Sequence, residues 1–212
     1  MNRIEDLARH YLELVRGVQS EGPYLLAGAS FGGVVSFEMA QQLQEHGQRT
    51  ALLALLDSPD LEALARESFD EVIILTGLLR EGTDLPVPVL MDTLRSLDAE
   101  ARFRYALEQG RKARTFPDHF ELSELQHLVH LMDQHFQALR SYRPRAYSGE
   151  MIYFRAAERD ALNPPYPEKS WIPLAPEGVS IHEVPGGHES MTRPPHGPSL
   201  AAKLNRYLVR LE

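Results

Sequence analysis

The sequence predicts an α/β fold in which a mainly parallel sheet carries a large helical insertion. Two short apolar segments, Tyr24–Ala29 and Thr50–Leu56, are typical of buried strands, and a helical pattern separates them. A strand, a helix and a second strand make a βαβ unit, in which the two strands run parallel. The 212 residues fit a single domain, because no linker is long enough to join a second one.

The first 56 residues supply the elements of this unit in order. Apolar residues recur at helical spacing over Ile4–Val18, and a cluster of helix breakers follows at residues 20–23. We expect Tyr24–Ala29 to be buried on both faces. Phe31–Glu45 has a helical pattern, and Gly47 stands where a glycine commonly ends a helix.

Residues 60–142 have no strand pattern and predict a helical insertion between strands. Ser68 and Glu71 have the spacing of a capping box, and so do Ser123 and Gln126. A further helix is expected over about residues 98–114. An apolar stripe at helical spacing follows Ser123 and consists of Leu125, Leu128, Val129, Met132, Phe136 and Leu139.

The sheet resumes after this insertion. Residues 151–154 and Val179–Val184 predict two more strands, with a proline-rich loop over residues 163–176 between them. Residues 185–188 form a glycine-containing loop after the last strand. Apolar residues at helical spacing over residues 200–211 predict a C-terminal helix.

Composition argues against several classes of protein. The chain has 22 basic and 30 acidic residues, a net charge of −8 and no basic tract, so nucleic acid is not an expected partner. It has no cysteine, which excludes disulfides, thiolate metal sites and a cysteine nucleophile. No apolar run approaches the ~20 residues of a membrane span, and the charged first residues do not resemble a signal peptide. We expect a cytoplasmic protein that does not bind membranes.

The sharpest chemical signal is Gly28-Ala29-Ser30-Phe31-Gly32, a G-x-S-x-G sequence between a buried strand and a helix. A nucleophile elbow requires this context, because a tight turn there projects the serine hydroxyl above the carboxyl edge of the sheet. Glycines at both ends allow the turn to be strained. The Phe31 N–H, at the start of the helix, would then be an oxyanion donor. The alternative is a plain Gly-Ser turn.

A serine nucleophile needs a base, and His188 is the leading candidate. It lies in the loop after the last strand, at the same predicted edge as Ser30. His182 falls inside a strand and fits a packed residue better, while His196 follows two prolines and has no clear role. No metal site is expected, because three other histidines do not share a helix face with a carboxylate. These histidines are His127, His130 and His135.

Two residues compete to be the acid that orients this base. Asp57 ends the strand after the elbow, and Asp160 follows the next strand along the chain. Both preserve the order serine, aspartate, histidine that α/β-hydrolases have. Asp57 also fits an Asx turn before Pro59, and Asp160 also fits a plain loop carboxylate, so the residues alone leave both open.

At these positions the chain resembles the thioesterase domains that end nonribosomal peptide and polyketide synthases, within the α/β-hydrolase superfamily. The likeness covers nearly the whole chain and is weakest through the insertion. Its motifs occur in order at residues 22–33 with 37–40, 55–59, 142–144 with 147–149, 154–156 with Trp171, and 184–188.

The resemblance implies an acyl or peptidyl substrate held as a thioester on the phosphopantetheine of a carrier protein, with no cofactor of the chain's own. Ser30 would take the acyl group, His188 would accept the proton, and Asp57 would hold the imidazole. Water or an internal nucleophile would then release an acid or a macrocycle. Stand-alone editing thioesterases place their acid later, which keeps Asp160 as the alternative. The insertion would form a lid.

One departure from the family concerns the N-terminal region, where members have several strands and a helix before the elbow and this chain has one helix. An α/β-hydrolase fold shortened in this way predicts that Tyr24–Ala29 is an apolar edge strand. Three explanations stay open: the chain is a fragment of a longer protein, a partner in a homodimer covers the edge, or a shortened domain persists with weak or no activity. The missing part normally carries a second oxyanion donor. Three alternative functions stay open: a stand-alone editing thioesterase, an esterase acting on oxygen esters, and a truncated non-catalytic module that docks a carrier protein.

An acidic carrier protein would need basic surface on this acidic chain. A solvated helix face is the plainer interpretation of the basic residues that gather in the insertion. They are Arg102, Arg104, Arg111, Lys112 and Arg114.

Overall fold

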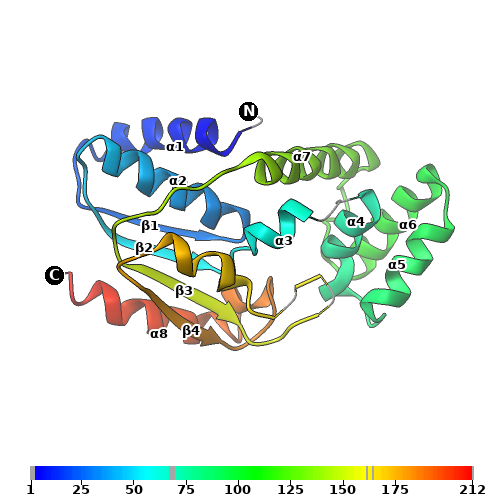
Figure 1. The fold of residues 1–212 in the computed structure, drawn as a ribbon. Coiled ribbons are helices and arrows are strands. Elements are labelled where there is room, and N and C mark those ends of the chain that lie inside the picture. Colours follow the sequence, from blue (N-terminus) through cyan, green and yellow to red (C-terminus); the bar gives the residue numbers. More distant parts are fainter. Residues whose placement is uncertain (1–2, 67–69, 161, 164, 212) are drawn as a thin grey trace. The chain divides into compact units, whose positions relative to one another are not determined.

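The computed structural model describes residues 3–66, 70–160, 162–163 and 165–211 (Figure 1). The chain divides into two compact units. The first, here called the sheet unit, comprises Met1–Arg66, Ala138–Arg159 and Asn163–Glu212. The second, the helical unit, comprises Glu67–Gln137 and Asp160–Leu162. The single domain with an insertion at about residues 60–142 stays a prediction, although most of the helical unit falls within those bounds.

The sheet has the parallel arrangement that the sequence predicts. Its strands are β1 (Tyr24–Ala29), β2 (Thr50–Leu56), β3 (Met151–Ala156) and β4 (Val179–Val184). They lie side by side in the order β1-β2-β3-β4, and each neighbouring pair is parallel. All four carboxyl ends therefore meet at one edge, where the segments that follow the strands come together.

Helices cover the sheet on both faces (Figure 1). On one side α2 (Phe31–Glu45) contacts β1 and β2, and α1 (Ile4–Val18) packs on α2. On the other side α8 (Gly197–Leu208) joins β2, β3 and β4 in an apolar core that includes Leu52 and Phe154. A short helix, α3 (Leu61–Arg66), follows β2. Gly47 follows α2 at a φ of 68°, as the sequence predicts.

The predicted burial of β1 on both faces is wrong. Tyr24 and Leu26 are buried, but Leu25 is 54% exposed, and Ala27 and Ala29 are exposed as well. The parallel register aligns Leu25 with Leu52 of β2, whose face is covered by α8 in the region of β2 to β4. β1 lies at the end of the strand order, beyond that cover, and this confirms the prediction of an apolar edge strand.

The helical unit contains α4 (Glu71–Leu79), a 3₁₀ turn (Arg80–Gly82), α5 (Val87–Ser96) and α6 (Ala99–Lys112), and most of α7 (Leu122–Ser141). It has an apolar core of its own. In that core Leu125 and Val129 of α7 are buried, with Met132 and Phe136 packed against them. The described part of the chain contains no helix that is long and apolar enough to cross a membrane.

Helix caps explain where these helices begin, and two predicted caps need comment. The Asp70 side chain accepts the Ile73 N–H at the start of α4, while Ser68 lies outside the described residues. The predicted cap at Ser123 is wrong, because α7 already begins at Leu122. Instead Glu124 accepts the Glu121 N–H at 2.7 Å, which is the reciprocal half of a capping box shifted along the chain.

Short 3₁₀ helices occupy the proline-rich segment that the sequence predicts to be a loop. They span Pro167–Ser170 and Ile172–Leu174, and they enclose the fully buried Trp171. The Trp171 indole N–H donates to the Pro59 carbonyl at 2.9 Å, and its ring lies edge-on to Phe37 of α2. These contacts hold the segment against the sheet unit just beyond the end of β2.

Candidate active site

Ser30 stands in the turn between β1 and α2 with a φ of 51° and a ψ of −124°. A non-glycine residue in such a conformation costs about 1–3 kcal/mol, so surrounding contacts must hold it there. The Ser30 N–H donates to the Leu56 carbonyl of β2 at 2.8 Å, and the Gly33 N–H donates to the Ser30 carbonyl at 3.0 Å. A β carbon on Gly28 would lie 2.2 Å from the Gly32 oxygen. This is the strained turn that the G-x-S-x-G sequence predicts.

Phe31 is the first residue of α2, so its N–H lies at the positive end of the helix dipole, next to Ser30. A growing negative charge on an oxygen near Ser30 would be stabilised at that position. The role of the Phe31 N–H as an oxyanion donor stays a prediction.

Asp57 follows β2, also with a positive φ of 47°. Its N–H donates to the Phe154 carbonyl at 2.7 Å, which keeps the residue next to the end of β3. The side chain is 2% exposed, and its Oδ1 accepts the Ala156 N–H at 2.9 Å. Oδ2 lies 2.7 Å from His188 Nδ1. The structure thus joins the predicted acid and the predicted base directly.

His188 lies in the loop after β4 and is 14% exposed. The loop is braced by the Gly187 N–H, which donates to Ser190 Oγ at 2.9 Å, and by the Glu158 N–H, which donates to the Gly186 carbonyl at 3.0 Å. With Nδ1 on the carboxylate, Nε2 is the ring nitrogen left to act on a substrate or a nucleophile. Within the described residues, no hydrogen bond joins the Ser30 hydroxyl to His188.

The other candidates have different surroundings. Asp160 belongs to the helical unit, where its Oδ2 lies 3.5 Å from an Arg80 nitrogen and its Oδ1 accepts the Leu162 N–H at 2.9 Å. His182 is packed as its strand position predicts: its Nε2 lies 2.5 Å from the Tyr207 hydroxyl of α8, and its ring stacks on Phe154. Asp57 is therefore the acid that contacts His188.

Sequence reasoning missed Arg159, which contacts the same carboxylate. Its Nη2 lies 2.5 Å from Asp57 Oδ1 and its Nη1 lies 3.1 Å from Oδ2. Burial on its own would raise the pKa of Asp57. Hydrogen bonds from His188, Arg159 and the Ala156 N–H outweigh it, so the pKa is below its usual value and the carboxyl is ionised at neutral pH. The only signal in the sequence was a cation placed shortly after a predicted strand.

The family model of the thioesterase domain matches residues 1–208. The chain belongs to the thioesterase domain family. This agrees with the resemblance noted from the sequence, and the family and the parallel sheet support a hydrolase that acts on thioesters.

Curated relatives of this thioesterase domain are large synthases. It is 27% identical to malpibaldin synthetase of Mortierella alpina over 209 residues, and 28% identical to chondramide synthase cmdD of Chondromyces crocatus over 209 residues. It is 29% identical to a dimodular nonribosomal peptide synthase of Bacillus subtilis over 194 residues. The alignments cover 96%, 93% and 90% of this chain but only 3%, 5% and 8% of these proteins.

Solved structures with the same fold include thioesterase domains of the α/β-hydrolase type. A NocB thioesterase domain in covalent complex with a fluorophosphonate nocardicin G analog is 26% identical, with a TM-score of 0.62, over 98% of this chain and 75% of that one. The four-domain nonribosomal peptide synthetase AB3403 has a TM-score of 0.80 at 21% identity, over 96% of this chain and 16% of that one. The predicted fold class is confirmed.

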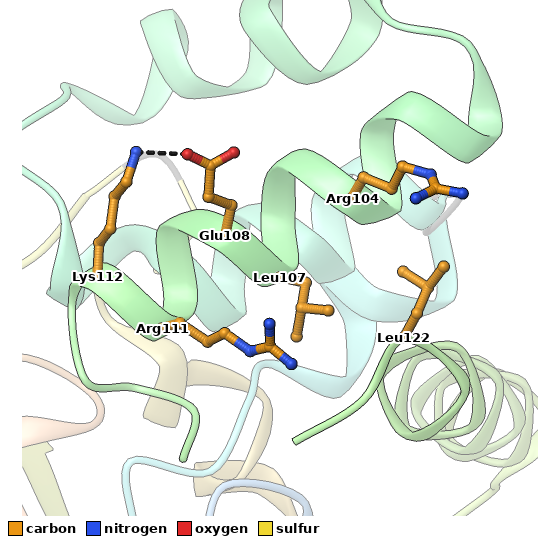
Figure 2. Close-up of a pocket in the computed structure, with 6 residues that line it drawn as sticks. All are labelled: Arg104, Leu107, Glu108, Arg111, Lys112 and Leu122. Carbon is orange, nitrogen blue, oxygen red and sulfur yellow. Dashed lines mark ion pairs between the residues drawn. The ribbon is translucent and has the colours of Figure 1, made fainter. Parts of the chain in front are cut away.

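A hollow of about 360 Å³ lies in the helical unit of this thioesterase domain, and Figure 2 shows its lining. Two of its cations are paired with carboxylates of the same helix, Lys112 with Glu108 and Arg104 with Glu100, both at 2.6 Å. A third, Arg111, donates to the Phe120 carbonyl at 2.7 Å. Arg104 and Lys112, at 67% and 63% exposed, match the solvated helix face that is the plainer interpretation of the sequence. Arg102 does not: it is 19% exposed, pairs with Glu71 and donates to the Leu94 and Leu97 carbonyls, so it joins parts of the helical unit.

Proposed function

We propose that this domain is a serine thioesterase that releases an acyl or peptidyl chain from the phosphopantetheine thioester of a carrier protein, by hydrolysis or cyclisation. The observation that carries the proposal is the 2.7 Å hydrogen bond between His188 Nδ1 and Asp57 Oδ2. It lies at the edge of the sheet where Ser30 holds a strained turn. A strained serine, a histidine and a buried ionised carboxylate are the groups that acyl transfer through an acyl-serine requires.

In the proposed reaction, Ser30 Oγ attacks the thioester carbonyl while His188 Nε2 accepts the hydroxyl proton. The carbonyl oxygen becomes negatively charged, and the Phe31 N–H is placed to donate to it. The carbon–sulfur bond then breaks, and His188 returns the proton to the departing thiol, which leaves the acyl group on Ser30. Asp57 fixes the Nδ1–H tautomer of His188 and stabilises its protonated form.

The second half of the reaction releases the chain. Water, or a hydroxyl or amine of the acyl chain itself, gives a proton to His188 and attacks the acyl-serine ester. Ser30 leaves as its hydroxyl, and the product is an acid or a macrocycle. The choice between these outcomes depends on whether water reaches the ester.

The proposed partner is a phosphopantetheine-bearing carrier protein, since the curated relatives are synthases that include nonribosomal peptide synthases. A second copy of the chain is a further proposed partner, because β1 is an edge strand with the apolar Leu25 exposed. The domain needs no cofactor for the proposed chemistry, in which every proton is moved by His188.

Labelling with a fluorophosphonate tests the proposal without knowledge of the substrate. We expect intact mass spectrometry to show a single adduct on the 212-residue chain and none on Ser30→Ala. Asp57→Asn should slow labelling by at least about 100-fold, since loss of the orienting acid costs up to ~10⁴ in a serine hydrolase. Asp160→Asn, the matched control, should label at the unmodified rate.

Two results would overturn the proposed activity, and a third would overturn only the assignment of Asp57 as the acid. A folded chain with no adduct would indicate a non-catalytic module that docks a carrier protein. Faster turnover of an oxygen ester than of the matching acyl-pantetheine thioester would indicate an esterase instead. Equal slowing by Asp57→Asn and Asp160→Asn would remove the assignment of Asp57 as the acid.

A further inference from the structure

The Asp57 carboxylate accepts hydrogen bonds from three sources, and one of them is a guanidinium. The Ala156 N–H and Arg159 Nη2 reach Oδ1, at 2.9 and 2.5 Å. His188 Nδ1 and Arg159 Nη1 reach Oδ2, at 2.7 and 3.1 Å. Arg159 therefore holds both oxygens at once, and its side chain is only 15% exposed. The two terminal nitrogens of the planar guanidinium, here called the fork, each bond one carboxylate oxygen. This pair of hydrogen bonds fixes the orientation of the carboxylate, which a single ammonium charge would not do.

The backbone places Arg159 at this carboxylate. Arg159 follows β3, and the two residues before it are hydrogen-bonded to the end of β4 and to the loop that follows β4. The Ala157 N–H donates to the Val184 carbonyl at 2.8 Å, and the Glu158 N–H donates to the Gly186 carbonyl at 3.0 Å. Gly186 belongs to the loop that carries His188. One set of hydrogen bonds thus positions the guanidinium and the imidazole on the two sides of Asp57.

We infer that Arg159 is a positioning residue of this site, which orients the Asp57 carboxylate toward His188 and limits how strongly that carboxylate favours the imidazolium. The inference rests on the proposed function. It adds to a serine–histidine–aspartate arrangement a fourth side chain that acts through the acid and does not touch the substrate.

Two physical effects support this inference. The fork and the Ala156 N–H restrain rotation of the carboxylate, so Oδ2 keeps its 2.7 Å contact with His188 Nδ1. The guanidinium also shares the negative charge of Asp57, so less of that charge is available to stabilise a protonated imidazole. Removal of the positive charge should therefore favour the imidazolium. His188 would then hold its proton up to a higher pH, and the free base needed to activate Ser30 would form only above that pH.

The other charged and titratable groups around Asp57 do not change this direction. Tyr153 of β3 is fully buried, and its hydroxyl donates to the Ser58 carbonyl. Burial, followed by the nearby charge of Asp57, raises the pKa of Tyr153 far above its usual value, so it is neutral throughout the range of interest. Glu168 and Asp60 also act on Tyr153, but Glu168 pairs with Arg155, and Asp60 accepts the N–H groups of Glu62 and Ala63. The charged groups in direct contact with Asp57 are Arg159 and, when it is protonated, His188.

The test compares Arg159→Gln, Arg159→Lys and a matched control, Arg155→Gln, in the full chain. Arg155 lies on β3 and is similarly buried, at 22% exposed, but it pairs with Glu168 and Glu183 instead of Asp57. The rate of fluorophosphonate labelling is measured from pH 5 to 9, together with thermal unfolding. The pH dependence of the His188 ring resonances is followed by NMR in the same variants.

For Arg159→Gln we expect the midpoint of the labelling profile to move up by roughly one pH unit, the lower end of the shift that a neighbouring charge produces. The His188 ring should titrate at a correspondingly higher pH. Arg159→Lys should keep the midpoint, because it keeps the charge. It should lose several-fold in the plateau rate, because it lacks the fork. Arg155→Gln should leave both quantities unchanged, and thermal unfolding separates these effects from a loss of fold.

The outcomes separate this inference from the proposed function. Identical His188 titrations in the unmodified chain, Arg159→Gln and Arg155→Gln would overturn the inference, whether or not Ser30 is labelled. An unlabelled chain whose His188 titration still moves in Arg159→Gln would overturn the proposed function and keep the coupling. If Arg159→Gln does not fold, the plateau rate of Arg159→Lys decides, and a plateau equal to that of the unmodified chain would refute the role of the fork.

Discussion

The two glycines that flank Ser30 contribute differently to the elbow. A β carbon on Gly28 would lie 2.2 Å from the Gly32 oxygen and 2.6 Å from the Gly33 nitrogen, both backbone atoms that cannot move aside. A β carbon on Gly32 would meet no atom within 4 Å. We therefore expect Gly28→Ala to lower the free energy of unfolding by about 1–3 kcal/mol or more, because extra atoms forced into a packed site usually cost that much. Gly32→Ala should be neutral or stabilising by up to about 1 kcal/mol, because it replaces a glycine inside a helix.

Urea unfolding of both variants and the fluorophosphonate labelling rate check this difference. Gly28→Ala should also lose labelling, because the turn that holds Ser30 is displaced. Equal stability of the two variants would mean that the turn relaxes to admit a β carbon.

At the residue scale, the placement of Ser30 and His188 at one edge of the sheet could be predicted, because each follows a recognisable strand and parallel strands bring such positions to one edge. The acid could not be decided from the residues alone, since Asp57 and Asp160 both follow strands. The decision depends on the side chains around each one, and Asp160 pairs with Arg80, a residue 80 positions away in the sequence. Arg159 was missed for the same reason, because its contact with Asp57 depends on how the backbone turns after β3.

At the scale of elements, a buried carboxylate of α2 is hydrogen-bonded to Tyr142, the residue that follows α7. Glu38 of α2 is 4% exposed, and its two oxygens accept from the Tyr142 hydroxyl and from Gln42 Nε2, both at 2.8 Å. We expect Tyr142→Phe to lower the free energy of unfolding by about 1–3 kcal/mol, since it leaves a buried charged oxygen without its donor. Tyr11→Phe, at a tyrosine that is 47% exposed, should change it by less than about 0.5 kcal/mol.

Chemical denaturation of the two variants measures this contrast. Burial, followed by the charge of Glu38, raises the pKa of Tyr142, so its hydroxyl is a donor over the whole working range and the loss should not vary between pH 6 and 9. A loss for Tyr142→Phe no larger than for Tyr11→Phe would show that water or another group satisfies Glu38.

The elements themselves were more predictable than their surroundings. Apolar runs located β1, β2 and β3, because a strand in a parallel sheet commonly needs apolar residues on both faces. β4 mixes apolar and polar residues and lies at the other end of the strand order, with Ile181 39% exposed. That rule failed for the exposed face of β1, since exposure depends on which helices cover the sheet and where the cover ends. The start of α7 was misplaced by a similar ambiguity, because residues 121–124 and 123–126 both have capping-box spacing and only the fold selects between them.

At the scale of the whole molecule, the sequence predicts an insertion but not the use of its apolar stripe. Leu125 and Val129 could have lined an acyl channel or filled a core, and the pattern is the same in both cases. The structure uses both residues in the apolar core of the helical unit. The destination of an apolar face depends on packing between segments distant in sequence, which periodicity along one helix does not encode.

The proposed association of two copies depends on the edge of the sheet at β1. Among the described residues, β1 has one neighbouring strand, β2, and Leu25, Ala27 and Ala29 are exposed along it. Such an edge can pair with another strand, and charges or bulges reduce that tendency. The register of β1 shifts between Tyr24 and Leu25, so the regular stretch open to pairing runs from Leu25 to Ala29. We expect the chain to associate with itself through β1, and Leu25→Lys to shift it to monomer in sedimentation velocity over a 100-fold range of concentration. Leu25 is 54% exposed, so its substitution should change the free energy of unfolding by less than about 0.5 kcal/mol.

Leu14→Lys is the matched control for this prediction, because Leu14 is similarly exposed, at 57%, but lies on α1 away from a strand edge. General loss of apolar surface would reduce association in both variants, whereas strand pairing would be lost only in Leu25→Lys. A chain that stays monomeric throughout the concentration range would show that the apolar face of β1 does not recruit a second copy. Equal effects of the two substitutions would assign the association to apolar surface in general, and the open edge of the sheet would then have no part in it.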